Sequence, residues 1–190
     1  MRTQNIAIFA SGEGSNALNL YHYFKNHHKI AVKKLICNKP EAAVINKFKN
    51  TEIETILLKK EEFLNAECLL GKLSDIDFIV LAGFLWLIPP FLTTSFKDRI
   101  INLHPSLLPK FGGKGMYGLN VHKAVIEAKE RESGITIHLV NEEYDKGKII
   151  KQYKCFIEAN DSPEILAVKI HKLEQKYLPS TIEEYILSVL

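Results

Sequence analysis

The sequence predicts an α/β protein built on an open, mostly parallel, doubly wound sheet with helices on both faces and an antiparallel strand pair in the C-terminal half. Two observations support this fold class. Short apolar runs alternate with amphipathic stretches through the first half of the chain, as in strands joined by right-handed helical crossovers. Further on, apolar runs at 134–140 and 148–157 are separated by only seven residues, which favours antiparallel pairing.

The N-terminal half contains five predicted strands. Their apolar runs lie at 5–10, 32–38, 53–58, 78–83 and 99–103. The first strand leads through a glycine-containing loop into a helix from about Asn16, because apolar residues then recur at helical spacing. Further helices are predicted at 41–49 and over the amphipathic stretch 61–73. A short helix interrupted by prolines is predicted after residue 88. Such alternation is typical of a Rossmann-like sheet.

Helices also flank the predicted strand pair of the C-terminal half. One is predicted over 119–129, where apolar residues again recur on one face. In the stretch "DSPE", 161–164, a polar capping residue followed by proline favours the start of another helix. Pro179 is expected to stop that helix, and the capping-box pattern at 180–183 predicts a separate final helix.

Length and composition indicate one intracellular domain that spans residues 1–190. The formal net charge is +3, from 25 basic and 22 acidic residues, which is too balanced to imply a nucleic-acid partner. The most apolar run, 78–92, is too short for a membrane span and contains glycine and proline. No signal-peptide pattern follows Met1, so the expected location is the cytoplasm. The cysteines, which lack any CxxC pair and argue against a zinc site, are Cys37, Cys68 and Cys155.

The loop after the first strand, "FASGEGSNALNL", is a candidate phosphate site. It departs from the GxGxxG dinucleotide pattern because Ala17 takes the last position, and Asn38 rather than an acidic residue ends the second strand. NAD is therefore disfavoured. Outward-facing backbone N–H groups at a helix N-terminus still bind anions well. A tight turn without a ligand is the alternative. The candidate ligands in this loop are Gly12, Gly14, Ser15 and Asn16.

The run "LAGFLWLIPP", 81–90, places Gly83 at the carboxyl edge of the predicted sheet, where such folds bind ligands. A glycine there allows a ligand to approach the backbone. An apolar run with a single tryptophan is also typical of protein core, and that interpretation stays open from these residues alone.

The strand end "INLHPSLLP" supplies a second candidate site. Asn102 and His104 are two residues apart, so they point to the same face of a strand. Together they can polarise a carbonyl group and stabilise an oxyanion. Asp145, in the short loop "EEYDKG", is by itself a common turn former. Placed beside His104, its carboxylate would raise the pKa of the imidazole and accept a proton.

Four stretches in combination resemble the phosphoribosylglycinamide (glycinamide ribonucleotide) formyltransferases, members of the folate-dependent formyltransferase family. They are "SGEGSN", "LAGF", "INLHPSLLP" and "GITIHLVNEEYDKGKII". Their order and spacing match over about residues 5–180. Only the HPSLLP block is specific when taken alone.

The resemblance implies transfer of a formyl group from 10-formyltetrahydrofolate, as cosubstrate, to the amino group of 5-phosphoribosylglycinamide, without a metal. Residues 1–100 would supply the ribotide half and residues 101–190 the folate-binding and catalytic half. The partners would be small molecules rather than nucleic acid or membrane, and the protein a monomer or homodimer.

The resemblance also assigns roles to residues. Asn102, His104 and Asp145 match the catalytic trio. The implied ribotide and phosphate ligands are Gly12, Gly14, Ser15, Asn16, Gly83, His171 and Glu174. The implied folate contacts are Leu85, Trp86, Leu87, Ile88, Asn102, Val140, Glu142 and Asp145. The hypothesis is direct acyl transfer: Asn102 and His104 stabilise the oxyanion, and Asp145 assists proton movement while orienting His104.

Three features depart from the family pattern. Trp86 stands where many relatives carry a basic residue, which suggests stacking in place of a polar folate contact. His171 stands at a position that is often an amide, which would make phosphate affinity more dependent on pH. The glycine-rich loop at 112–118 is longer by about four residues than in shorter members, and its Lys114 is either a ligand for an anion or part of a merely longer surface loop.

Other functions remain possible from these residues. A formyltetrahydrofolate hydrolase or a methionyl-tRNA formyltransferase would use the same trio, but each is expected to need a further domain. A non-catalytic module that binds a phosphate-bearing ligand would explain the glycine loop and leave the trio unexplained. Ser106 has no partner base in a recognisable nucleophile elbow, so it is interpreted as a loop residue.

Overall fold

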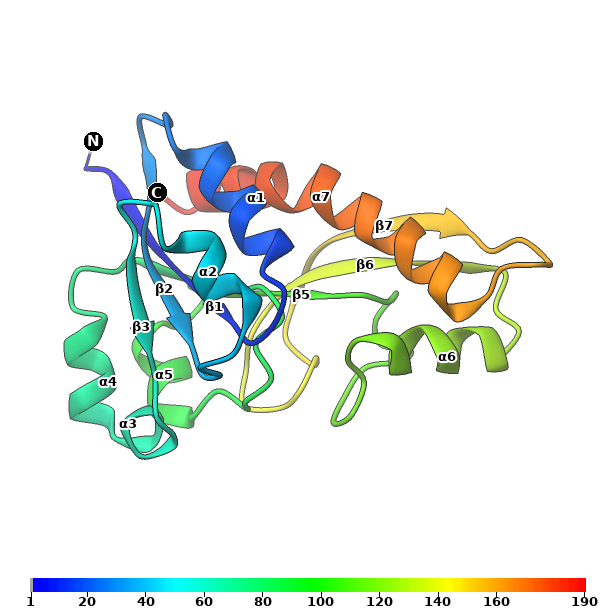
Figure 1. Cartoon of the computed structure of the whole chain (residues 1–190), viewed down its shortest axis with the longest axis horizontal. Helices are drawn as coiled ribbons and strands as arrows, with labels where there is room; N and C mark the ends of the chain where they lie inside the picture. The colour runs from blue at the N-terminus through cyan, green and yellow to red at the C-terminus, as the bar shows by residue number, and fades with distance from the viewer. Residues whose placement is uncertain (1) are drawn as a thin grey trace. The chain divides into compact units, whose positions relative to one another are not determined.

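The computed structural model describes residues 2–190. Its strands follow the order β3-β2-β1-β4-β5-β6-β7 in one seven-stranded sheet of mixed direction, accompanied by helices, and the predicted fold class is confirmed (Figure 1). The chain forms two compact units, one that ends at Ile101 and one of Asn102–Leu190. The boundary falls within β5 (Ile100–His104).

The first unit is built on parallel strands. They are β1 (Gln4–Ala10), β2 (Ile30–Cys37), β3 (Glu54–Leu57) and β4 (Phe78–Leu81). β1 pairs in parallel with both β2 and β4, and β2 pairs in parallel with β3. All four residues of β4 are buried, as expected for a central parallel strand covered on both faces. The helices α1 (Ser15–Phe24) and α2 (Ala43–Phe48) pack against each other and on β2.

The helical stretch predicted over 61–73 is divided into two helices, α3 (Lys60–Leu64) and α4 (Ala66–Lys72). Asn65 takes an extended conformation between them, and its side-chain oxygen accepts a hydrogen bond of 2.9 Å from the backbone N–H of Cys68. Asparagine is a strong N-cap residue, so it starts a new helix where the apolar periodicity alone suggested continuity. The predicted short helix is α5 (Pro90–Ser95), which begins at a proline instead of being interrupted by one.

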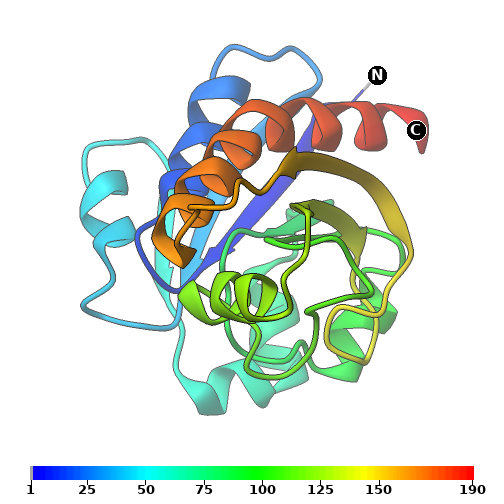
Figure 2. The same cartoon turned by 90° about the vertical axis from the view of Figure 1, so that its right-hand side faces the viewer.

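The second unit contains the predicted hairpin. The strands β6 (Glu132–Leu139) and β7 (Ile149–Phe156) pair antiparallel, which confirms the pairing inferred from their short connection. The helices α6 (Leu119–Glu127) and α7 (Pro163–Ser188) pack against each other, and α7 lies along β6 and β7 (Figures 1 and 2).

The helix α7 corrects one prediction, because it continues through Pro179 to Ser188. A proline inside a helix costs about 3 kcal/mol. The side chains of Leu178, Ile182 and Ile186 around it are fully buried, and each such burial is worth roughly 1.5–3 kcal/mol. Packing therefore outweighs the local penalty. The predicted capping box is absent, and the Ser180 hydroxyl instead donates to the backbone carbonyl of Tyr177.

Two further findings concern membrane-spanning helices and metal sites. Within residues 2–190, no helix combines the length and the apolar character that crossing a bilayer requires. The same residues contain no group of three or more histidine, cysteine or acidic side chains placed to hold a metal ion. Cys37 is buried, whereas Cys68 and Cys155 are partly exposed.

Candidate active site

The end of β5 and the loop between β6 and β7 bring the predicted trio together within the second unit. Asn102 Nδ2 lies 3.3 Å from Asp145 Oδ1, and His104 Nδ1 lies 3.4 Å from Asp145 Oδ2. The His104 side chain is almost completely buried, and that of Asp145 is 11% exposed. The loop therefore places the Asp145 carboxylate next to both side chains at the end of β5.

A fourth residue of the site, His138 on β6, was missed by the sequence interpretation. Its ring is 1% exposed, and its Nδ1 lies 2.7 Å from the Leu139 carbonyl. A carbonyl only accepts hydrogen bonds, so Nδ1 carries the proton and Nε2 of the neutral ring accepts. Asn102 Nδ2 donates to this Nε2 across 3.0 Å. His138 thus sets which way the Asn102 amide points.

The backbone of the glycine-rich loop completes the site. The carbonyl of Phe111 accepts a hydrogen bond of 2.8 Å from His104 Nε2, and the N–H of Gly113 donates to Asp145 Oδ2 across 2.8 Å. At Gly112 a Cβ atom would lie 2.5 Å from a methyl group of Leu108 and 3.2 Å from the Asp145 Cβ. Glycine at this position therefore leaves room for the close approach of the loop to the carboxylate, and any side chain there would make the Leu108 methyl group move.

Burial lowers the pKa of His104 below its ordinary value, although the Asp145 carboxylate and the Phe111 carbonyl act in the opposite direction. The expected rise from Asp145 is present, but burial outweighs it. For Asp145, burial raises the pKa, yet the proximity of His138 and His104 and the hydrogen bond from the Gly113 N–H together bring it below its ordinary value. At neutral pH the site therefore holds a neutral His104 beside a carboxylate.

A third buried histidine, His122 on α6, lies close enough to His104 for a positive charge on His104 to lower its pKa. Burial lowers the pKa of His122, and the charge of His104 lowers it further. Its Nδ1 atom is buried and has no hydrogen-bond partner among the described residues. This residue was also missed from the sequence.

The glycine loop of the first unit has the geometry of a strand-to-helix turn. Gly14 adopts a left-handed conformation with φ of 73°, and a Cβ atom there would lie 2.2 Å from the Val44 side chain. The N–H of Val44 donates to the Gly12 carbonyl across 3.1 Å. Ser15 then begins α1, so Ser15 and Asn16 lie in the first turn, where helix N–H groups favour anions.

The loop after β4, also in the first unit, is anchored on the end of β1. The N–H of Ser11 donates to the Gly83 carbonyl, and the N–H of Leu85 donates to the Ser11 hydroxyl, each across 3.1 Å. Gly83 is exposed with φ of 78°, and a Cβ atom there would meet nothing within 4 Å. This loop therefore leaves open space beside a glycine at the carboxyl edge of the parallel strands.

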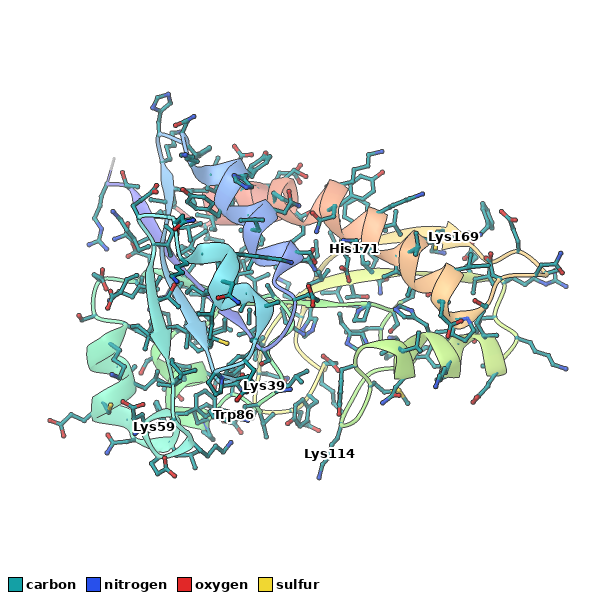
Figure 3. All side chains as sticks on the ribbon, in the orientation of Figure 1. Lys39, Lys59, Trp86, Lys114, Lys169 and His171 are labelled. Atoms are coloured by element: carbon teal, nitrogen blue, oxygen red, sulfur yellow. The ribbon has the colours of Figure 1, made fainter. Side chains whose placement is uncertain are left out.

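Trp86, labelled in Figure 3, lies in the same loop and is partly exposed, and its ring packs on two buried aromatic residues. Its ring centroid lies 5.1 Å from that of Phe63 and 5.9 Å from that of Phe84. The Lys60 ammonium lies 4.3 Å from the Trp86 ring centroid, a favourable cation–π geometry. A cation therefore lies over the Trp86 ring. Of the remaining predicted folate contacts in this loop, Leu87 is 43% exposed and Ile88 is buried.

The other predicted ligands of the second unit lie on α7 and in the loop after β6. His171 lies on α7 (Figure 3). Its Nδ1 is 3.2 Å from Glu174 Oε2 on the same helix, so these two predicted ribotide ligands are in contact. Val140 is partly exposed and Glu142 is exposed, in the same loop as Asp145. Ser106 donates to the Lys110 carbonyl across 2.8 Å and serves as a loop residue, as interpreted from the sequence.

Comparisons with known proteins support an enzymatic site. A family model described as "Formyl transferase" matches residues 4–182. A chloroplastic phosphoribosylglycinamide formyltransferase of Arabidopsis thaliana is 39% identical over 97% of this chain and 68% of the plant protein. The phosphoribosylglycinamide formyltransferase of Bacillus subtilis is 33% identical over 95% of this chain and 94% of the relative. The crystal structure of phosphoribosylglycinamide formyltransferase from Bacillus halodurans superposes with a TM-score of 0.85 at 36% identity, covering 95% of this chain and 94% of that one.

Proposed function

The chain belongs to the formyl transferase family, and we infer that it is a phosphoribosylglycinamide formyltransferase. Its sequence resemblance to that family is confirmed. The enzyme transfers a formyl group from 10-formyltetrahydrofolate to the amino group of 5-phosphoribosylglycinamide in de novo purine biosynthesis. The observation that carries this proposal is the buried cluster in which one carboxylate, Asp145, contacts both Asn102 and His104.

The first step is attack by the neutral amine of the ribotide on the formyl carbon. A C–N bond forms, and the formyl oxygen becomes an oxyanion. Both N–H bonds of the Asn102 amide are engaged, one with His138 Nε2 at 3.0 Å and one with Asp145 Oδ1 at 3.3 Å. The oxyanion replaces Asp145 in the longer of these contacts. Asp145 takes the proton of the attacking nitrogen, which removes its charge and releases that N–H.

His104 then completes the proton path. Its Nε2–H is held by the Phe111 carbonyl, so its Nδ1 faces Asp145 Oδ2 at 3.4 Å and accepts the proton. The resulting Nδ1–H stabilises the oxyanion. When the intermediate collapses, the bond from carbon to the folate nitrogen breaks, and that nitrogen takes the proton. The products are the N-formyl ribotide and tetrahydrofolate, without a covalent enzyme intermediate.

The residues for substrate binding follow from the same proposal. The phosphate binds at the N-terminus of α1. Ser15 and Asn16 lie in the first turn of this helix, and Gly12 and Gly14 belong to the loop that precedes it. Gly83, His171 and Glu174 contribute further ribotide contacts. The folate is contacted by the segment 85–88 and by Val140 and Glu142, together with Asn102 and Asp145. Residues 1–190 act as one formyltransferase domain. A cytoplasmic location and a monomeric or homodimeric state stay predictions.

One assay tests this function. The protein is mixed with 10-formyltetrahydrofolate, and formation of the deformylated folate is followed with and without phosphoribosylglycinamide. Product formation that depends on the ribotide is the expected result. Product formation without the ribotide would instead indicate a hydrolase, and no product under either condition would favour a module that only binds phosphate-bearing ligands.

A further inference from the structure

The hydroxyl of Thr136, on β6, is fully buried and makes three hydrogen bonds. It donates to the Ser106 carbonyl across 2.6 Å and accepts from the Leu108 N–H across 3.0 Å. It also accepts from Gln152 Nε2 across 2.9 Å. A hydroxyl has one hydrogen and two lone pairs, so all of its capacity is used. This side chain holds both ends of the segment Ser106–Leu108.

Gln152 strengthens the same attachment from β7. It is the antiparallel partner of Thr136 in the ladder, so both side chains lie on one face of the hairpin. The second hydrogen of its Nε2 goes to the Leu108 carbonyl across 2.9 Å. Both N–H bonds of the amide are therefore engaged with Thr136 and with the loop.

The held segment leads directly to His104. The Ser106 hydroxyl donates to the Lys110 carbonyl at 2.8 Å and lies 3.4 Å from the Phe111 carbonyl. The Phe111 carbonyl in turn accepts from His104 Nε2. Phe111 is a non-glycine residue with φ of 56°, a left-handed conformation that persists only where the surroundings enforce it.

We propose that Thr136 and Gln152 are positioning residues that fix the ring of His104 through the loop 106–111. They hold Ser106 and Leu108, the Ser106 hydroxyl contacts the Lys110 and Phe111 carbonyls, and the Phe111 carbonyl keeps the proton of neutral His104 on Nε2. Nδ1 is then left facing Asp145, ready to accept a proton. This inference rests on the proposed formyl transfer, because it explains how the proton acceptor of that reaction is oriented.

Replacing Thr136 by valine tests the proposal with little change in shape. The variant leaves the Ser106 carbonyl, the Leu108 N–H and one N–H of Gln152 without their partner. We expect kcat to fall roughly 10- to 100-fold, because displacement of a reacting group by about 1 Å costs that order of rate. The KM values for both substrates should change less than threefold. Thr136→Ser keeps the hydroxyl and should restore kcat to within about threefold of the wild type.

A matched control is available on α7. Thr181 is also buried, and its hydroxyl pairs with that of Tyr153 at 2.9 Å. Thr181→Val therefore removes a buried hydrogen-bonded hydroxyl of the same kind outside the loop attachment. It should lower the unfolding midpoint while leaving kcat unchanged. A similar loss of kcat in both variants would overturn the positioning role.

Nuclear magnetic resonance of ring-¹⁵N-labelled histidine gives a readout that needs no activity. Wild-type His104 should show the tautomer protonated on Nε2, and Thr136→Val should shift its ring resonances toward a mixture of tautomers. Unchanged resonances together with unchanged kcat would refute the proposal. If the wild-type resonances behave as expected but no formyl transfer occurs, the proposed function fails while the attachment of His104 stands.

Gln152→Met provides a second variant if Thr136→Val does not fold. Gln152 is partly exposed, so its replacement by an apolar chain of similar length should be tolerated. It removes two hydrogen bonds to the attachment and should shift the His104 resonances in the same direction, with a smaller loss of kcat. A folded Gln152→Met protein with wild-type resonances and kcat would exclude a role for this residue.

Discussion

Asn102 donates to His138 through a hydrogen bond of 3.0 Å between Nδ2 and Nε2. The proton on His138 Nδ1 is fixed by the Leu139 carbonyl at 2.7 Å, which leaves Nε2 as an acceptor and selects one of the two orientations of the amide. In that orientation both N–H bonds of Asn102 face the site. His138 thus decides whether the Asn102 amide acts as a donor.

Replacing His138 by leucine should lower kcat about tenfold, because Asn102 loses the acceptor that orients its amide while the amide itself remains. The measurement is steady-state formyl transfer with both substrates varied. The double variant with Asn102→Ala provides the decisive comparison. If His138 acts only through Asn102, adding His138→Leu to Asn102→Ala should cost no further rate. Fully additive losses would contradict this coupling.

His138 also shows how far the sequence predicts the site. The period-2 spacing of Asn102 and His104 was sufficient to place both side chains on one face of a strand, and the seven-residue connection was sufficient to predict the hairpin that carries Asp145. Thr136 and His138 repeat the same spacing in the segment 134–139 of β6, whose other residues are buried and carry no polar side chain. Two polar residues at positions i and i+2 of a buried strand indicate a polar site on one face of that strand. The sequence of β6 therefore carries a signal for His138.

Other parts of the site and fold have no such signal. The Phe111 carbonyl and the Gly113 N–H are backbone groups, and every residue offers the same ones. Their contacts with His104 and Asp145 depend on the path of the loop. The continuation of α7 through Pro179 likewise depends on burial of distant side chains, which local propensity does not contain.

Removal of the His104 ring should reduce kcat about 100- to 1,000-fold, the usual cost of losing one preorganised oxyanion donor. The variant His104→Ala should still bind both substrates, since the loss applies to the transition state. His28→Ala is the matched control, because His28 is exposed in the first unit. Near-normal turnover of His104→Ala would exclude the proposed proton path.

The phosphate loop can be tested at Gly14. In Gly14→Ala the added methyl group would lie 2.2 Å from Val44 at a φ of 73°, so the turn must move. We expect a KM for the ribotide raised at least about tenfold, with the KM for the folate changed much less, because one lost hydrogen bond to a charged group is worth roughly 1.5–3 kcal/mol. The left-handed conformation should also cost about 1–2 kcal/mol of stability.

Gly71→Ala is the control for that experiment. Gly71 lies within α4, and a Cβ atom there would meet nothing within 4 Å. The change should stabilise the protein by roughly 0.5–1 kcal/mol, since alanine is the better helix former, and should leave both KM values unchanged. A folded Gly14→Ala protein with a normal ribotide KM would remove this loop from the binding site.

The buried ring of His122 makes stability depend on pH. Burial lowers the pKa of His122, and the charge of His104 lowers it further. In the unfolded chain a histidine titrates near its ordinary pKa of about 6.5. Below that pH the unfolded state therefore binds a proton that the folded state does not, and the free energy of unfolding falls as the pH is lowered toward the depressed pKa of the folded protein.

The variant His122→Leu should reduce this acid sensitivity. Between about pH 7.5 and 5.5, one histidine that stays neutral when folded accounts for at most about 1.4 kcal/mol of lost stability. Urea unfolding of the wild type and variant at both pH values measures the difference directly. The loss should be smaller in His122→Leu by up to that amount and unchanged in His28→Leu, where the ring is exposed. Because His104 is also buried with a lowered pKa, part of the acid sensitivity should persist. An identical pH dependence in wild type and His122→Leu would mean that His122 takes up its proton in the folded protein as readily as in the unfolded chain.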